Sequence, residues 1–327
     1  MNILISRTDA IGDVILTIPM AGYLKKEFPG CKIFFLGRTY TKPIVEISEY
    51  IDDFLNWDSI SKLPEAEQVN TFSALNLDWF IHVYPDKKIA QIAHKAKVKN
   101  RVGTSHRTYN WLTCNKKVSF SRKKSDLHEA QLNFKLLEPL GIEFVPELKV
   151  FPFLYGMKAK VQELPVSPSK NKVSVILHPK SKGSAREWGL DNFERLIDLL
   201  QEDTYEVFIS GTEADKNEMA DWLKKIGNKA VDITGKLNLE QFVSFIGQAD
   251  ALIAASTGPL HIASALGKKA IGIYPPIRPM HPGRWKPLGQ HAEVLVKEIE
   301  CESCRKLNEC ACMLSISPED VVRLLES

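Results

Sequence analysis

Short apolar runs alternate with amphipathic stretches from one end of the chain to the other. Residues 2–6 form such a run, and a helical pattern follows from Val14 to Phe28, where Pro29 and Gly30 end it. Buried strands that alternate with helices are typical of a parallel sheet covered by helices on both faces. The pattern therefore predicts an α/β fold with doubly wound sheets.

The alternation recurs in two halves, which a polar stretch rich in proline and serine separates near residues 156–172. We expect two Rossmann-like domains, an N-terminal one over residues 1–160 and a C-terminal one over residues 172–312, with carboxyl sheet edges that face one another across a cleft. The expected strands are 2–6, 32–36, 53–57, 78–83, 100–103, 173–178, 205–210 and 230–233, and the expected helices are 14–28, 42–48, 65–75, 87–97, 126–140 (ended by Gly141), 191–202, 215–226 and 238–248.

One strand–helix–strand unit, residues 249–276, carries the clearest sign of a binding site. An apolar run ends in a turn with two hydroxyls, after which Pro259 is placed to open a helix and Gly267 to close it. The first N–H groups of that helix would be unpaired at the carboxyl edge of the sheet, which favours an anion such as phosphate. The alternative is an ordinary turn with nothing bound. The residues expected at the anion site are Ser256, Thr257, Gly258, Pro259 and His261.

Two further turns of the second half should reach the same sheet edge. Residues 178–188 offer flexible cations and hydroxyls suited to a diphosphate, and residues 210–213 offer a carboxylate suited to a ribose diol. Together the three turns predict a site for a nucleotide diphosphate. His178 and His261 are expected to be hydrogen-bonded rather than metal ligands, because nothing nearby in the sequence completes a coordination set. The candidates from these two turns are Lys180, Ser181, Arg186, Gly211 and Glu213.

The first turn of the chain, residues 7–13, holds a carboxylate at the start of a helix. It contains one glycine, so it matches neither the dinucleotide fingerprint nor a P-loop. Asp13 could simply stabilise the helix dipole. It could equally serve as a general base on a rigid element that faces a cleft.

Composition and charge restrict the class of protein. At 327 residues the chain is long enough for two cores, and no apolar run approaches the ~20 residues that span a bilayer. The start of the chain lacks a signal-peptide core, so we expect a cytoplasmic protein. The net charge is +3, yet residues 86–124 hold twelve Lys and Arg against the single acid Asp86. Such a segment suggests an anionic substrate, an anionic membrane face or nucleic acid, unless it is only a solvated surface.

Four of the six cysteines lie close together near the end of the chain. In a cytoplasmic protein disulfides are not expected, so these thiols could hold zinc or an iron–sulfur cluster, or could be free. The four residues are Cys301, Cys304, Cys310 and Cys312.

Three blocks, residues 3–19, 178–188 and 256–267, resemble the signature blocks of the family 9 glycosyltransferases, the lipopolysaccharide heptosyltransferases. The resemblance runs in order over nearly the whole chain. It implies a GT-B fold and inverting transfer of heptose from ADP-heptose to the lipopolysaccharide inner core, with no metal or other cofactor in catalysis. It also implies that the reaction takes place at the cytoplasmic face of the inner membrane, which the protein would contact peripherally, and that nucleic acid is not a partner.

The resemblance also assigns roles to single residues. Asp13 matches the catalytic base of the family, and a helix over residues 317–327, capped by Ser317, would pack back on the N-terminal domain. The turns named above would bind the donor, and the cysteines would stabilise a loop away from catalysis. An anionic glycolipid acceptor would meet the basic surface of the N-terminal domain through Arg7, Arg101 and Arg107.

Two positions depart from the family pattern. Ser256 stands where many members have an acid, and Arg186 stands where many have lysine, which bears on the identity of the donor rather than on the fold. Two alternatives therefore stay open: transfer of another nucleotide-activated sugar to another glycan, and a two-domain binding protein without catalysis.

Overall fold

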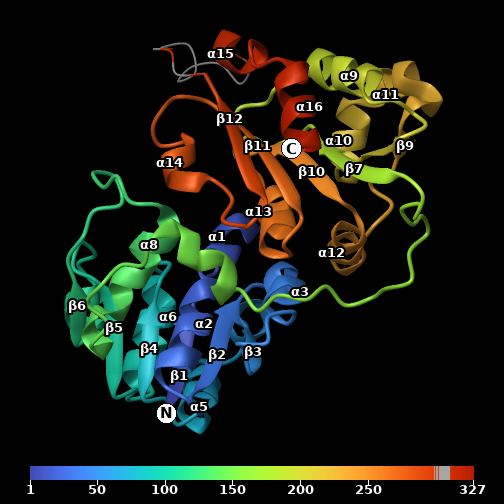
Figure 1. The fold of residues 1–327 in the computed structure, drawn as a ribbon. Helices are drawn as coiled ribbons and strands as arrows, with labels where there is room; N and C mark the ends of the chain where they lie inside the picture. Colours follow the sequence, from blue (N-terminus) through green and yellow to red (C-terminus); the bar gives the residue numbers. More distant parts are fainter. Residues whose placement is uncertain (298, 300, 302–309) are drawn as a thin grey trace. The chain divides into compact units, whose positions relative to one another are not determined.

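The structure is a computed structural model, and it describes residues 1–297, 299, 301 and 310–327. The chain divides into two compact units, Met1–Lys158 and Ala159–Ser327 (Figure 1). Each unit consists of one parallel sheet with helices around it, and each has an apolar core of its own. No helix among the described residues is long and apolar enough to cross a membrane.

The sheet of the first unit has six parallel strands in the order β3-β2-β1-β4-β5-β6. This is the Rossmann order, in which the direction of strand succession reverses between β1 and β4, and ligands bind at the carboxyl ends of strands beside such a reversal. The strands are β1 (Asn2–Ser6), β2 (Lys32–Gly37), β3 (Asp53–Asn56), β4 (Trp79–His82), β5 (Asn100–Thr104) and β6 (Lys116–Val118).

Two long helices predicted for the first unit take another form in the structure. Residues 14–28 were expected to form one helix, but α1 (Ile11–Ile15) and α2 (Ile18–Glu27) are separate, because Pro19 lacks the N–H that a continuous helix would need. The helix predicted over 126–140 begins at Glu129 as α8 (Glu129–Phe134) and continues as a 3-10 helix, η2 (Lys135–Leu140), which contains Pro139. Gly141 ends it with a positive φ of 89°, as predicted.

The other helices of this unit cover the sheet. An apolar cluster that includes Leu4, Phe72, Phe80 and Ile89 fills the space between the sheet and its helices. These helices are η1 (Thr39–Thr41), α3 (Lys42–Val45), α4 (Trp57–Ile60), α5 (Glu65–Ala74), α6 (Lys87–Lys95), α7 (Asn110–Thr113) and η3 (Leu148–Leu154).

The second unit repeats the Rossmann order as β12-β11-β10-β7-β8-β9, again all parallel. Its reversal lies between β7 and β10, which are hydrogen-bonded neighbours. The predicted linker was residues 156–172; Met157 forms an isolated bridge with Ser48, and residues 159–172 carry neither helix nor strand. The strands are β7 (Val173–His178), β8 (Tyr205–Ile209), β9 (Val231–Asp232), β10 (Ala251–Ala255), β11 (Lys269–Tyr274) and β12 (Ala292–Val296).

The C-terminal helix α16 (Pro318–Glu326) belongs to the second unit. It was expected to pack on the N-terminal domain, but it packs on α9 (Leu190–Leu199) and β11. Val321 and Leu325 enter the apolar core of the second unit, which gives the amphipathic helix its partner there. The Ser317 side chain accepts a hydrogen bond from the Asp320 N–H at 3.2 Å, the predicted cap. The remaining helices are α10 (Glu213–Glu218), α11 (Ala220–Ile226), η4 (Gly227–Lys229), α12 (Leu239–Gln248), α13 (Gly258–Ala265), α14 (Pro282–Trp285) and α15 (Ala311–Leu314).

Candidate active site

Three adjacent strands of the second unit, β10, β7 and β8, end at one edge of the sheet. The register pairs Ala254 with His178 and Leu177 with Ile209, so the turns that follow these strands begin at the same level. All three turns therefore meet where the strand order reverses, the usual ligand position in such a sheet. The donor-binding residues predicted in the second unit thus lie at one edge of its sheet.

The turn after β10 presents a buried hydroxyl and a helix start. Thr257 is the N-cap of α13 and is only 6% exposed. Its hydroxyl caps no helix N–H, and among the described residues it has no hydrogen-bond partner. A buried polar group normally has a partner, and the first N–H groups of a helix attract anions. The turn therefore has the free hydrogen-bonding capacity that a phosphate would use.

The turn after β7 is organised by Glu187. Its carboxylate accepts from the Ser181 N–H at 2.9 Å and from the Lys180 ammonium at 2.7 Å. Lys180 also lies 3.2 Å from Glu218, and these carboxylates raise the pKa of the ammonium although partial burial acts to lower it. Glu187 was not predicted as a site residue, although it lies within one of the three sequence blocks. It holds both Lys180 and Ser181 in place.

The turn after β8 places Glu213 at the start of α10. Thr212 caps this helix through Asp215, whose carboxylate accepts from the Thr212 N–H at 2.7 Å. Glu213 is exposed, and its side chain lies directly over Gly235. A Cβ at position 235 would be only 2.0 Å from Oε2 of Glu213. Gly235 has a φ of 68°, so glycine is needed there for both space and conformation. Gly211 precedes this turn, as predicted.

Of the two histidines of this edge, His261 is buried and His178 half-buried, and both are neutral at physiological pH. Burial lowers the pKa of His178 and that of His261 to about 4 in each case. His178 Nδ1 lies 2.9 Å from the Ser210 hydroxyl. Among the described residues, His261 Nδ1 has no hydrogen-bond partner. Neither residue supplies a cation at neutral pH, and Lys180 and Arg186 are the predicted cations of this edge.

In the first unit, the turn after β1 leads Asp13 into a buried network of charges. Asp13 lies in the first turn of α1, and the guanidinium of Arg7 forms an ion pair with it. Arg7 also pairs with Asp9 at 2.6 Å and with Glu129 at 3.2 Å, and it is only 4% exposed. The guanidinium expected to bind an acceptor is thus engaged by three carboxylates of its own chain, and it orients Asp13.

The pKa of Asp13 is raised to about 6. Burial is the main cause, and the charges of Asp9 and Glu129 add to it, whereas Arg7 and Arg122 act in the opposite direction. Three carboxylates, those of Asp9, Asp13 and Glu129, thus lie with the guanidinium groups of Arg7 and Arg122. A carboxyl with a pKa near neutrality that is still ionised at pH 7 is suited to general-base catalysis.

Glu129, Arg122 and Asn133 complete this network and were not predicted as site residues. Glu129 accepts from Arg122 at 3.0 Å, and Arg122 donates to Asn133 Oδ1 at 2.9 Å. Asn133 in turn donates to the Leu16 carbonyl at 3.1 Å, at the break between α1 and α2. In the sequence, Glu129 looks like an ordinary first-turn carboxylate of a helix, and Arg122 looks like one member of the basic run.

The structure separates the two other predicted acceptor residues. Arg107 is exposed and follows the carboxyl end of β5, on the same sheet edge as the Asp13 turn. Arg101 lies near the amino end of β5, where its Nε donates to the Thr113 carbonyl at 2.6 Å. The side chain of Arg101 thus serves local structure at the other edge of the sheet.

Three of the four predicted metal-ligating cysteines lie together in the second unit. The sulfur atoms of Cys301, Cys310 and Cys312 are within 4.8 Å of one another and could hold a metal ion. Cys304 lies outside the described residues.

Two Rossmann-like units in one chain are the architecture of the GT-B glycosyltransferases. The chain belongs to glycosyltransferase family 9 (heptosyltransferase), whose model matches residues 76–313. It is 28% identical over 298 residues to a Haemophilus influenzae protein described as a glycosyltransferase, covering 88% of this chain and 86% of that protein. It is 25% identical over 281 residues to lipopolysaccharide heptosyltransferase 3 of Escherichia coli K12, covering 80% and 79%.

Solved structures confirm the predicted GT-B fold. A family 9 glycosyltransferase from Veillonella parvula superimposes with a TM-score of 0.77 at 21% identity, over 100% of this chain and 97% of that one. The ADP-heptose lipopolysaccharide heptosyltransferase II of Escherichia coli gives a TM-score of 0.75 at 16% identity, over 100% and 98%. The chain is thus a glycosyltransferase with the fold of these enzymes, and the alternative of a non-catalytic binding protein is not supported.

Proposed function

We propose that this protein is an inverting heptosyltransferase that moves heptose from ADP-heptose to the inner core of lipopolysaccharide, with Asp13 as the catalytic base. The observation that carries the proposal is the carboxyl of Asp13, held by Arg7 at the carboxyl edge of the first sheet with a pKa of about 6. Family membership and the lipopolysaccharide heptosyltransferases among its relatives support the choice of sugar and acceptor.

The proposed reaction needs one base and one leaving group. Asp13 takes the proton of an acceptor hydroxyl while that oxygen forms a bond to the anomeric carbon of the sugar. The bond from this carbon to the diphosphate breaks on the opposite face, which inverts the configuration. The diphosphate leaves with the bonding electron pair, and Asp13 later returns its proton to solvent.

The leaving diphosphate gains negative charge, and we assign its stabilisation to the edge formed by β7, β8 and β10. Lys180, Arg186 and the N–H groups that follow Thr257 supply the positive potential. Lys180 would exchange a carboxylate of Glu187 or Glu218 for a phosphate oxygen. Glu213 would contact the ribose. On this account the transfer requires no added divalent cation.

We further propose that an exposed part of the basic segment contacts the anionic surface of the inner membrane from the cytoplasmic side. Trp111 and Leu112 of α7 are 63% and 81% exposed. The Lys117 ammonium lies 5.2 Å above the Trp111 ring, and Lys116 is exposed beside it. An aromatic and an aliphatic side chain flanked by lysines match the boundary between anionic headgroups and acyl chains.

Vesicle flotation tests the membrane contact. We expect the double variant Trp111→Ser, Leu112→Ser to associate less with vesicles that contain anionic lipid, because it removes the exposed apolar pair. Phe153→Ser is the matched control, since Phe153 is also an exposed apolar residue of the first unit, at 58%. Equal association of the double variant and the wild type would contradict the proposal.

Donor selection by the purified protein tests the function itself. Transfer is measured by mass spectrometry with a panel of nucleotide sugars and a lipopolysaccharide acceptor that lacks heptose, without added divalent cations. We expect ADP-heptose to be used with the highest kcat/KM. Preference for another nucleotide sugar would reject heptose as the transferred sugar but would leave the assignment as a glycosyltransferase in place. Binding of ADP-heptose without transfer would reject the proposed acceptor.

A further inference from the structure

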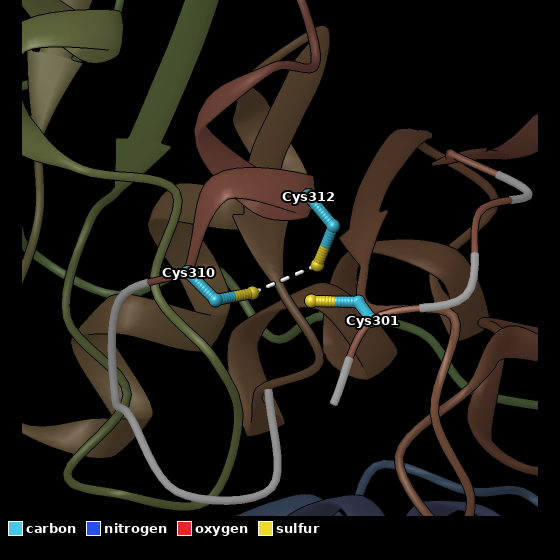
Figure 2. Close-up of side chains that lie close together, drawn as sticks. All are labelled: Cys301, Cys310 and Cys312. Atoms are coloured by element: carbon cyan, nitrogen blue, oxygen red, sulfur yellow. Dashed lines mark hydrogen bonds between the residues drawn. The ribbon is translucent and has the colours of Figure 1, made fainter. Parts of the chain in front are cut away.

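Three cysteine side chains converge at the end of the second unit. Figure 2 shows the sulfur atoms of Cys301, Cys310 and Cys312 directed toward one another. Cys310 and Cys312 are 3% and 1% exposed, and Cys301 is half-buried. The residues come from separate places: Cys301 follows β12, Cys310 precedes α15, and Cys312 lies within α15.

The three sulfurs lie close enough together to bind one metal ion if those of Cys310 and Cys312 move apart. The three sulfur atoms lie within 4.8 Å of one another, and those of Cys310 and Cys312 are 2.7 Å apart. A tetrahedral zinc ion with bonds of about 2.3 Å places its sulfur ligands roughly 3.8 Å apart, so small movements of these side chains would complete the site. In a [4Fe–4S] cluster each cysteine binds a different iron, and in a [2Fe–2S] cluster each iron holds two cysteines. At least two of three cysteine sulfurs would therefore bind different irons and lie further apart than around a single ion.

We infer that Cys301, Cys310 and Cys312 bind a single thiolate-preferring ion, zinc(II), and that this ion stabilises the donor-binding turn of the second unit. Thiolate ligands select zinc, copper(I) and iron over magnesium or calcium. On binding, the three thiols release their protons to solvent, and the three sulfur ligands leave one position of the tetrahedron for another ligand. Two of the three sulfurs, those of Cys310 and Cys312, are buried.

The segment that carries these cysteines supports the turn after β7. Trp188, at the end of that turn, is fully buried, and its Nε1 donates to the Ile316 carbonyl at 2.9 Å. Asn192, in the helix that follows, donates to the Leu314 carbonyl at 3.1 Å. Leu314 also packs closely on Gly189, where a Cβ would lie 2.8 Å from its side chain.

The three cysteines and the turn after β7 also share one apolar core. Cys310, Cys312 and Met313 lie in the same buried cluster as Trp188, and Cys301 packs against that cluster. An ion that binds Cys301, Cys310 and Cys312 therefore stabilises the segment on which the turn with Lys180 and Ser181 packs. This second part of the inference rests on the proposed donor site, whereas the binding of the ion does not.

Metal analysis of protein purified under reducing conditions tests the ion directly. We expect about one zinc per chain in the wild type, and a loss of at least tenfold in Cys310→Ser and Cys312→Ser. Cys31→Ser is the matched control: Cys31 is a buried cysteine of the first unit whose sulfur donates to the Leu24 carbonyl at 3.6 Å, a bond that serine can keep. Its zinc content should equal that of the wild type.

A titration of the unaltered protein keeps the test independent of how the variants fold. Wild-type protein stripped of metal is titrated with zinc against a chromophoric chelator, and the reactive thiols are counted at each step. We expect one zinc to bind and to protect three thiols. Failure to bind zinc, visible absorption from an iron–sulfur cluster, or a disulfide between Cys310 and Cys312 under reducing conditions would each overturn the inference.

The proposed effect of the ion on the donor-binding turn is tested separately, by ADP binding. We expect removal of the ion to weaken ADP binding by about tenfold and zinc to restore it, because Trp188 and α15 lose their common support. If zinc binds but ADP affinity does not change, the link to the donor turn is wrong and the ion site stands. If ADP does not bind with or without zinc, the proposed donor site fails instead.

Discussion

The raised pKa of Asp13 predicts how the rate of transfer depends on pH. The carboxyl must be ionised to accept a proton, and its pKa is raised from 3.8 to about 6, first by burial and then by the charges of Asp9 and Glu129. The active form is therefore lost as pH falls through about 6. For one ionisation, about a tenth of the molecules are active at pH 5, so kcat/KM should fall roughly tenfold between pH 8 and pH 5. An ordinary aspartate would still be about nine-tenths ionised at pH 5.

The substitution Glu129→Gln tests the cause of the shift. Glu129 is 1% exposed and contributes one of the three carboxylates that share Arg7 and Arg122. Its charge is one of the causes that raise the pKa of Asp13, so removing it should move the acid limb of the profile to lower pH. Glu138→Gln changes an exposed glutamate in the same segment and should leave the profile unchanged.

The assay must follow product directly, because coupling enzymes have pH profiles of their own. Product is quantified by mass spectrometry between pH 5 and pH 8.5 at donor concentrations below KM, where the rate reports kcat/KM and hence the free enzyme. Circular dichroism at each pH checks that the fold is retained. A wild-type kcat/KM that stays nearly constant down to pH 5, or a limb near pH 6 that Glu129→Gln does not move, would refute the reasoning.

Three substitutions in the second unit give further predictions. Thr257→Val should weaken ADP binding by about tenfold, as measured by calorimetry, without loss of stability, because the hydroxyl has no partner among the described residues; Thr257→Ser should bind normally. Glu187→Ala should lower the free energy of unfolding in urea by about 1–3 kcal/mol, since Ser181 loses a charged acceptor; unchanged stability would contradict this. Gly235→Ala should raise the donor KM by displacing Glu213, and an unaltered KM would remove Glu213 from the donor site.

The fold was largely predictable because its signals are local. Each buried strand is a short apolar run, and each turn at the functional edge holds a hydroxyl, a glycine or a proline with a defined structural effect. Thr257 and Pro259 thus marked the start of α13 correctly. The break between α1 and α2 follows from Pro19, a local signal that the apolar pattern of the segment obscured.

The charge network around Asp13 was not predictable, because it depends on pairing over long distances in the sequence. Arg7 meets Glu129 across 122 positions, and nothing in either local pattern indicates the other. The same holds for α16: its apolar stripe predicts a buried face but not which unit buries it. Basic residues were similarly ambiguous, since Arg101 donates to backbone carbonyls whereas Arg107 is exposed.

The central claim, that Asp13 is the base of a transfer reaction, is tested most directly by the rate of Asp13→Asn with saturating ADP-heptose. We expect transfer to fall by about 10²–10⁴-fold while the Kd for ADP stays at the wild-type value. Ionisation of Asp13 opposes folding, because its pKa is raised in the folded protein, so asparagine should not lower thermal stability at pH 7.5. A folded Asp13→Asn variant that transfers heptose at the wild-type rate would contradict the account.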